Sequence, residues 1–95
     1  MKKEFCIMPP SQLYQTERFP GLHRHEVFFG SNRKNSIEYG LVVFLTPEQH
    51  NMSNQGIHFN RNFDLYIKKI AQKTAMQYYN WDISQWREIF GKSYL

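Results

Sequence analysis

The sequence predicts an α+β domain in which a β-hairpin is followed by helices, and three observations support this fold class. Two short segments read as strands, 22–29, which is rich in valine and phenylalanine, and the apolar run 40–45, with a polar stretch between them. The segment 62–79 carries apolar residues at the three- and four-residue spacing of a buried helical stripe. A last short segment starts at Asp82, a good helix-capping residue, and ends at Gly91.

The length and composition favour one small domain. The chain has 95 residues, and its 12 lysines and arginines outweigh 8 aspartates and glutamates for a formal net charge of +4. With a single cysteine, Cys6, it can form no internal disulfide and no cysteine-built zinc site. The longest apolar run, 40–45, is too short to cross a bilayer, and no signal peptide follows Met1. We therefore expect a reduced, cytoplasmic protein without membrane contact, whose charge permits a polyanionic partner.

Turn-forming residues divide the chain into two parts. Prolines and a glycine interrupt the first 21 residues repeatedly, which predicts an irregular segment. We therefore expect residues 1–21 to be an irregular N-terminal segment and residues 22–95 to form the folded domain.

The hairpin is expected within the first part of this domain. Its first strand is predicted over 22–29, and Gly30 ends it. Residues 31–36 are polar and basic, which suits a hairpin tip or an exposed loop. The second strand, 40–45, is apolar without alternation, so we expect it to be buried on both faces or wholly in the core.

Three helices are expected after the hairpin. Thr46 can cap the first, Pro47 fits its first position, and Gln49 completes a capping box. We expect that helix to end at Gly56. The long helix over 62–79 has a predicted buried stripe that consists of Ile67, Ile70, Ala71, Ala75 and Tyr78. The apolar residues of the last helix are Ile83, Trp86, Ile89 and Phe90.

All four histidines fall in the hairpin or shortly after it: His23, His25, His50 and His58. Side chains two residues apart on a strand point to the same side, so His23 and His25 share one face. Arg24 and Glu26 point to the other. Neutral imidazole binds divalent ions and accepts protons, and hydrolysis of a phosphodiester needs both a base and a cation. The alternative is that each histidine is an ordinary polar or half-buried side chain.

Four stretches of the chain resemble the HNH, or His-Me finger, nucleases. They are 22–30 (LHRHEVFFG), 32–46, 47–50 and the ending 89–95. More narrowly, they are similar to small HNH-type proteins of phages and prophages of Gram-positive bacteria. The resemblance extends over residues 22–95, and it implies a ββα-metal fold, a hairpin plus helix, with additional C-terminal helices.

The resemblance implies a metal-dependent endonuclease that hydrolyses phosphodiester bonds in nucleic acid, in the first place DNA. His25 matches the general base, His50 the ligand on the helix, and His58 the terminal histidine of the motif. His23 or Glu26 would supply a further ligand or orient the base, and we favour His23 because it shares a face with His25. The expected cofactor is a divalent ion, Mg²⁺ first, with Mn²⁺ and Zn²⁺ as alternatives, and we expect no other cofactor-binding site.

The sequence departs from the family pattern at two places near the site. Arg24 stands directly before the base, where an aspartate or a histidine is usual. The asparagine of the motif name has no clear match, and the candidates by proximity are Asn35, Asn51 and Asn54. These departures leave open a second function, a non-catalytic nucleic-acid- or protein-binding domain that retains the HNH-like fold.

Basic and aromatic residues could contact the nucleic acid. Arg33 and Lys34 could bind backbone phosphates, and Arg24 could clamp the cleaved phosphate by paired hydrogen bonds. The long helix adds Arg61, Lys68, Lys69 and Lys73, which form either a phosphate-binding face or an ordinary solvated one. The aromatic residues that either stack on bases or fill the core are Phe28, Phe29, Tyr78, Tyr79, Trp81 and Trp86.

Overall fold

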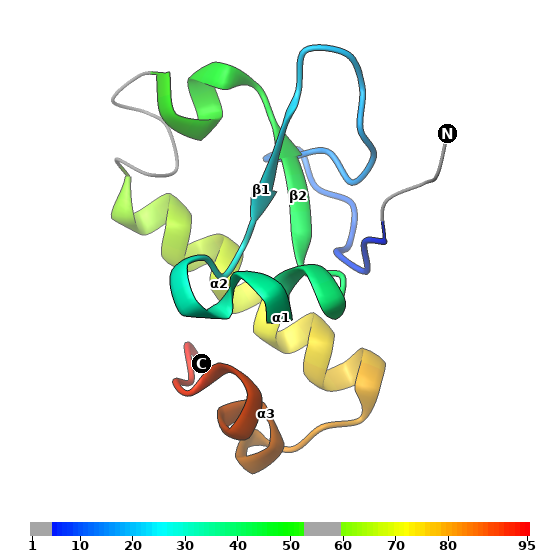
Figure 1. Ribbon diagram of the computed structural model, residues 1–95, viewed down its shortest axis with the longest axis vertical. Helices are drawn as coiled ribbons and strands as arrows, with labels where there is room; N and C mark the ends of the chain where they lie inside the picture. The colour runs from blue at the N-terminus through cyan, green and yellow to red at the C-terminus, as the bar shows by residue number, and fades with distance from the viewer. Residues whose placement is uncertain (1–4, 53–59) are drawn as a thin grey trace.

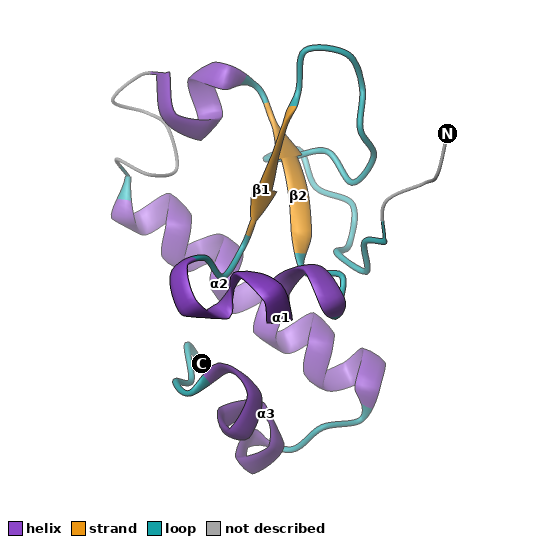
Figure 2. Cartoon of the chain, in the orientation of Figure 1, coloured by secondary structure: helices purple, strands orange, loops and turns teal. Residues whose placement is uncertain are grey.

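The computed structural model describes residues 5–52 and 60–95 (Figure 1). Along the chain, the elements are β1 His23–Glu26, η1 Gly30–Asn32, α1 Arg33–Glu38, β2 Val42–Leu45, η2 Glu48–Met52, α2 Arg61–Tyr79 and α3 Ile83–Phe90. Figure 2 shows the helices arranged around one pair of strands, which confirms the predicted α+β class. α2 crosses behind α1 in the view of Figure 1, and α3 lies at the far end from the start of β1.

The two strands pair antiparallel, and their register decides which side chains enter the core. His23 lies opposite Leu45, and His25 lies opposite Val43. Because side chains alternate along a strand, these pairs share one face, and Val43 and Leu45 belong to the same core cluster as Ile67, Ala71 and Ala75 of α2. The other face carries Arg24 and Glu26, as predicted.

β2 is buried along its whole length, which confirms the prediction for its apolar run. Its second edge is covered by the N-terminal segment. The backbones of Gln15 and Phe44 exchange hydrogen bonds of 2.9 and 2.8 Å, and Ile7 N–H donates to the Gly40 carbonyl at 2.9 Å. Residues 5–22 contain no helix or strand beyond this isolated bridge, but they contribute the buried Tyr14 to the core. The irregular segment therefore protects the sheet edge.

The connection between the strands corrects two predictions. β1 ends at Glu26 instead of residue 29, and residues 31–36 form no loop or hairpin tip but lie in η1 and α1. Ser36 joins the two ends of this connection by hydrogen bonds to Phe28 and Leu41. Its buried hydroxyl accepts a hydrogen bond from Phe28 N–H at 3.2 Å and donates one to the Leu41 carbonyl at 2.5 Å. After the end of β1 at Glu26, the N–H of Phe28 is therefore satisfied by a side chain eight residues later in the sequence.

Two asparagines hold α1 against the end of α3. The side-chain amide of Asn32 donates to the Phe90 carbonyl at 2.9 Å, and that of Asn35 donates to the Ile89 carbonyl at 2.9 Å. The last carbonyls of a helix lack partners within the helix, so these amides satisfy groups that would otherwise need water. The polar stretch is therefore a packed helical element.

α2 begins and ends close to the predicted positions. Asn60 caps it by accepting from Phe63 N–H at 3.1 Å, and Asn80 ends it in the left-handed conformation at φ 58°. The residues of the predicted stripe that are fully buried are Ile67, Ala71 and Ala75. Tyr78 is 61% exposed, so the prediction that it belongs to the buried stripe was wrong. Among the described residues, no helix combines the length and apolar character needed to span a membrane.

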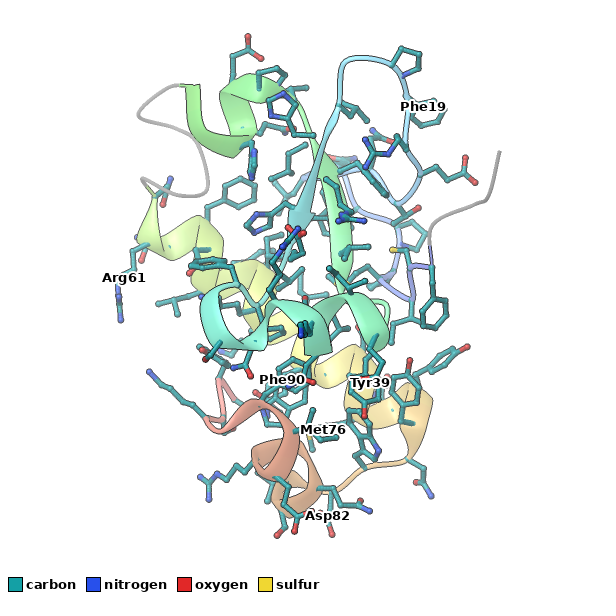
Figure 3. All side chains as sticks on the ribbon, in the orientation of Figure 1. Phe19, Tyr39, Arg61, Met76, Asp82 and Phe90 are labelled. Atoms are coloured by element: carbon teal, nitrogen blue, oxygen red, sulfur yellow. The ribbon has the colours of Figure 1, made fainter. Side chains whose placement is uncertain are left out.

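α3 and the aromatic core complete the fold. Asp82 and Gln85 form a reciprocal capping box with bonds of 2.8 and 2.9 Å, as the predicted helix start requires. Phe28 packs against Trp86 and Phe90, with ring centroids 5.2 and 4.9 Å apart. Figure 3 shows Phe90 close to Tyr39, between α1 and α3, and their ring centroids lie 6.3 Å apart. Phe28 and Trp86 are therefore core residues, not exposed stacking surfaces.

Candidate functional site

Three histidines from two elements lie together where β1 begins and β2 ends. The Nδ1 atoms of His23 and His50 are 3.3 Å apart, and their rings meet edge to face with centroids 5.5 Å apart. The His25 ring lies 5.3 Å from that of His50, also edge to face. His23 is exposed, His50 is half-buried, and His25 is only 1% exposed. The cluster thus runs from the surface into the core.

Local sequence explains why these side chains meet. The pleat of β1 places His23 and His25 on the same face. η2 follows β2 directly, and the predicted capping box holds its start: Gln49 N–H donates to Thr46 Oγ1 at 3.2 Å, and Thr46 N–H donates to Gln49 Oε1 at 3.1 Å. His50 N–H then donates to the Thr46 carbonyl at 2.9 Å. The cap therefore fixes the direction in which His50 leaves the strand.

The Nδ1 atoms of His23 and His50 are within hydrogen-bonding distance of each other, and the same spacing suits two ligands of one metal ion. Imidazole nitrogens and oxygens bind such ions at about 2.0–2.1 Å, so neighbouring ligand atoms lie roughly 2.8–3.0 Å apart in octahedral and roughly 3.3–3.4 Å apart in tetrahedral geometry. The observed 3.3 Å falls in the tetrahedral range. Within residues 5–52 and 60–95, no group of three or more His, Cys, Asp or Glu side chains could hold a metal ion. His58, predicted as a ligand, lies outside the described residues, as do Asn54 and Gly56.

His25 is enclosed by neighbours on the core side of the sheet. Its ring lies 6.0 Å from the Phe29 ring and 5.3 Å from that of His50, and Val43 faces it across the strands. A general base must reach the proton that it takes, directly or through one water. His25 is 1% exposed, so its ring has almost no direct access to solvent in this structure.

The opposite face of β1 carries a separate ionic cluster. Glu26 Oε1 lies 3.1 Å from Arg33 Nε and 3.4 Å from Arg24 Nη2. Burial raises the pKa of Glu26, but its backbone hydrogen bond, the Arg33 hydrogen bond and both arginine charges outweigh burial and leave that pKa below its usual value. The structure therefore places Arg24, the predicted phosphate clamp, beside a carboxylate and on the face away from His25.

The predicted nucleic-acid contacts Arg33 and Lys34 lie in the first turn of α1 and are both exposed. Arg33 belongs to the Glu26 cluster, with 62% of its side chain exposed. Asn35, a candidate for the asparagine of the HNH motif, points its amide at α3. It therefore contributes to the packing of α1 and not to the histidine cluster. The side chain of Asn51 lies outside the described part of the chain.

Sequence reasoning missed an ion pair beside the histidines. Lys68 Nζ lies 2.9 Å from Asp64 Oδ2, and both side chains are largely buried. The same Nζ lies 4.4 Å from the centre of the Phe29 ring, and Phe29 contacts His25. The i,i+4 spacing of Asp64 and Lys68 was the available signal. Lys68 is therefore an internal cation, unlike the solvated lysine or phosphate contact that its helical position suggested.

Comparison with known proteins adds no relative. The chain matches no known protein family, no curated protein and no solved structure.

Proposed function

We propose that the protein is a divalent-metal-dependent endonuclease that hydrolyses phosphodiester bonds in nucleic acid, in the first place DNA. The observation that carries this proposal is the histidine cluster, in which His23 and His50 place two nitrogens 3.3 Å apart and His25 lies directly behind them. A cation-binding pair next to a proton acceptor supplies the two services that this hydrolysis needs. The resemblance of residues 22–50 to the HNH pattern supports the same reading.

In this proposal the three histidines have different roles. His25 takes the proton of the attacking water, and its enclosure by Phe29 and Val43 holds the ring in one orientation. His23 and His50 would hold the divalent ion, which would stabilise the negative charge on the leaving oxygen. Mg²⁺ is expected from the resemblance, with Mn²⁺ and Zn²⁺ as alternatives. Two imidazole donors favour Zn²⁺ among these, because imidazole suits it better than the harder ions.

The arginines would act from the other face of the strand. Arg24 and Arg33 share the Glu26 carboxylate at 3.4 and 3.1 Å, so a phosphate oxygen would have to replace that carboxylate. Arginine binds either anion by charge-assisted hydrogen bonds. Neutralising Arg24 therefore tests whether this cluster serves catalysis or the fold.

A plasmid-nicking assay tests the proposal. We expect the purified protein to nick supercoiled DNA with Mg²⁺, Mn²⁺ or Zn²⁺ and to stop when EDTA is added. His25→Ala should abolish nicking while its circular dichroism spectrum stays that of the wild type, and added imidazole should restore part of the rate. Gln77→Ala, an exposed change on α2, is the matched control. Nicking by His25→Ala in the presence of EDTA contradicts the proposal.

Metal binding provides a readout that does not depend on cleavage. Titration of the protein with Mn²⁺, followed by electron paramagnetic resonance, should show binding that His23→Ala and His50→Ala each weaken by about tenfold or more. His25→Ala should bind Mn²⁺ as the wild type does. Equal binding by all four proteins contradicts the assignment of the ligand pair.

The second candidate function is a non-catalytic nucleic-acid- or protein-binding domain. The 1% exposure of His25 favours it, because a general base needs access to water. This function predicts salt-sensitive DNA binding without nicking in any divalent metal. The plasmid assay therefore separates the two candidates.

A further inference from the structure

A groove lies between the first half of α2 and the residues that follow α3. Its volume is about 470 Å³. α2 contributes Arg61, Tyr66 and Lys69, and the segment after α3 contributes Lys92 and Tyr94. Figure 3 shows the Arg61 side chain extending outward from the beginning of α2. The groove is lined by three cationic side chains and no acidic side chain, so positive charge is in excess there even when the α-carboxylate of Leu95 is counted, and the field attracts anions.

The cations of the groove are available to a ligand. Among the described residues, Arg61 and Lys69 form no ion pair with a carboxylate, and both are exposed. Lys68 differs from its neighbour because it pairs with Asp64 at 2.9 Å. α2 thus turns one lysine inward to a carboxylate and the next one outward into the groove.

The spacing of these charges suits an extended polyanion. Arg61 and Lys69 are eight residues apart, which is about 12 Å along the helix axis. Lys73 continues the line one turn further, and Lys92 faces it from the other side of the groove. A chain of phosphates can therefore contact several of these cations in succession, whereas a single compact anion is too small to do so.

An exposed aromatic ring lies among the cations. Tyr66 lines the groove and is 54% exposed, although tyrosine usually buries most of its ring. Tyr94 is better packed, because its ring lies 5.4 Å from that of Phe28. Grooves that bind single-stranded nucleic acid combine cations for the backbone with exposed rings on which bases stack.

One wall of the groove, the segment that follows α3, is held to α2 by a buried amide side chain. Gln72 is fully buried, accepts a hydrogen bond from Tyr94 N–H at 2.6 Å and donates one to Ser93 Oγ at 3.0 Å. The segment that carries Lys92 is therefore held to α2 at a fixed position. A rigid wall lowers the entropic cost of binding.

A chain of contacts joins the groove to the histidine cluster. Lys68 Nζ lies 5.5 Å from the centre of the Tyr94 ring and 4.4 Å from that of Phe29. The Phe29 ring lies 6.0 Å from that of His25. The groove and the histidine cluster are therefore linked through the side chains of Lys68 and Phe29.

We propose that this groove binds a single-stranded segment of polynucleotide, with its phosphates on Arg61, Lys69 and Lys92 and a base stacked on Tyr66. The proposal deepens the nuclease function and rests on it, since the bound segment is the strand that flanks the cleaved bond. Phosphates and unstacked bases are common to DNA and RNA, so the sugar is left to the experiment.

Fluorescence anisotropy with a labelled oligothymidylate of about 12 nucleotides tests the cations. The measurements are made in EDTA, so that no cleavage takes place. The slope of log affinity against log salt concentration should fall in magnitude by about 1.4 when Lys69→Gln and Lys92→Gln are combined, since each lost phosphate contact on a single strand contributes about 0.7. Arg87→Gln, which removes an exposed cation on α3, should leave the slope unchanged. An oligouridylate arm shows which sugar binds more tightly.

Substitutions of Tyr66 test whether a base stacks on its ring. Tyr66→Ala should weaken single-strand binding about fivefold or more, and Tyr66→Phe, which keeps the ring, should retain it. Duplex DNA should bind less tightly than the single strand and should not respond to Tyr66→Ala. Circular dichroism of each variant shows that the fold is kept.

Two results overturn the proposal. One is a salt slope that the double variant changes no more than Arg87→Gln does. The other is equal binding of Tyr66→Ala and the wild type. Absence of plasmid nicking by the wild type, with these binding results intact, overturns only the nuclease function. Nicking with an unchanged salt slope overturns only the groove.

Discussion

Replacement of Gln72 by leucine tests whether one buried amide holds the C-terminal segment to α2. Gln72 is 0% exposed and makes two hydrogen bonds to that segment, at 2.6 Å from Tyr94 N–H and at 3.0 Å to Ser93 Oγ. Leucine is close to glutamine in size but can make neither bond. The variant therefore changes hydrogen bonding with little change in packing.

The magnitude follows from the two bonds. Each contributes about 0.5–1.5 kcal/mol net to the free energy of unfolding, and the loss of both costs about 1–3 kcal/mol. The apolar leucine side chain offsets part of this cost, which leaves about 1–2 kcal/mol. In a domain of this size, 1 kcal/mol lowers the thermal midpoint by about 4–8 °C. We therefore expect Gln72→Leu to unfold about 4–16 °C below the wild type.

Thermal unfolding followed by circular dichroism measures this difference. Gln77→Leu, which places the same residue at an exposed glutamine of α2, is the control and should change the free energy of unfolding by less than about 0.5 kcal/mol. Single-strand binding by Gln72→Leu should also weaken, because Lys92 loses its fixed position. Equal thermal midpoints for Gln72→Leu and Gln77→Leu refute the reasoning.

Three further predictions concern a helix cap and two titrating groups. Asp82→Ala should lower the free energy of unfolding by about 1 kcal/mol in thermal unfolding, because α3 loses its capping box. The folded-state pKa of Glu26 lies below its unfolded value, so Glu26 contributes stability above the unfolded pKa that is lost as the pH falls through the folded pKa. Glu26→Gln should therefore lose less stability than the wild type between neutral pH and about pH 3. Burial, followed by the charges of Cys6 and Tyr66, raises the pKa of Tyr14 from 10.0 to about 12, so its contribution is present below pH 10.0 and lost as the pH rises through about 12. Tyr14→Phe should remove one late-titrating phenol from the ultraviolet pH titration.

Each of these predictions has an outcome that contradicts it. For the cap, it is an unfolding midpoint of Asp82→Ala that equals that of Ser84→Ala, an exposed change in the same turn. For Glu26, it is a decrease in the free energy of unfolding between neutral pH and about pH 3 that is the same in Glu26→Gln and the wild type. For Tyr14, it is a phenol titration that Tyr14→Phe leaves unchanged near pH 12.

Local signals predicted the elements that depend on neighbouring residues. The capping residues Thr46 and Asp82 each accept from the N–H three positions later, and the apolar run of β2 is buried on every side. The strand alternation also predicted that His23 and His25 share a face. The two caps and the strand alternation depend on residues within a few positions of one another, and the burial of β2 was indicated by its unbroken apolar run.

The errors arose where distant residues decide the structure. Residues 31–36 looked like a loop, but the amides of Asn32 and Asn35 find carbonyls 58 and 54 residues away, and the segment becomes helical. Tyr78 was placed in the buried stripe by its spacing, but its side chain is 61% exposed, whereas Ile67, Ala71 and Ala75 are fully buried. No local pattern indicates which helix the chain will meet.

The same limit applies to the candidate sites. The 3.3 Å between His23 and His50 depends on the angle at which η2 leaves β2. The groove depends on Lys92 returning to α2, more than twenty residues after Lys69. The residue types of both sites were visible in the sequence, but their distances were not.

The two asparagine amides that reach α3 also determine when α1 can dock on α3. Contacts between residues more than fifty positions apart form late, because the intervening chain must first be ordered. During synthesis, α1 cannot acquire these partners until Ile89 and Phe90 have been added and have left the ribosome. α1, which joins the two strands, thus acquires its contacts with α3 only after the other end of the chain has been made.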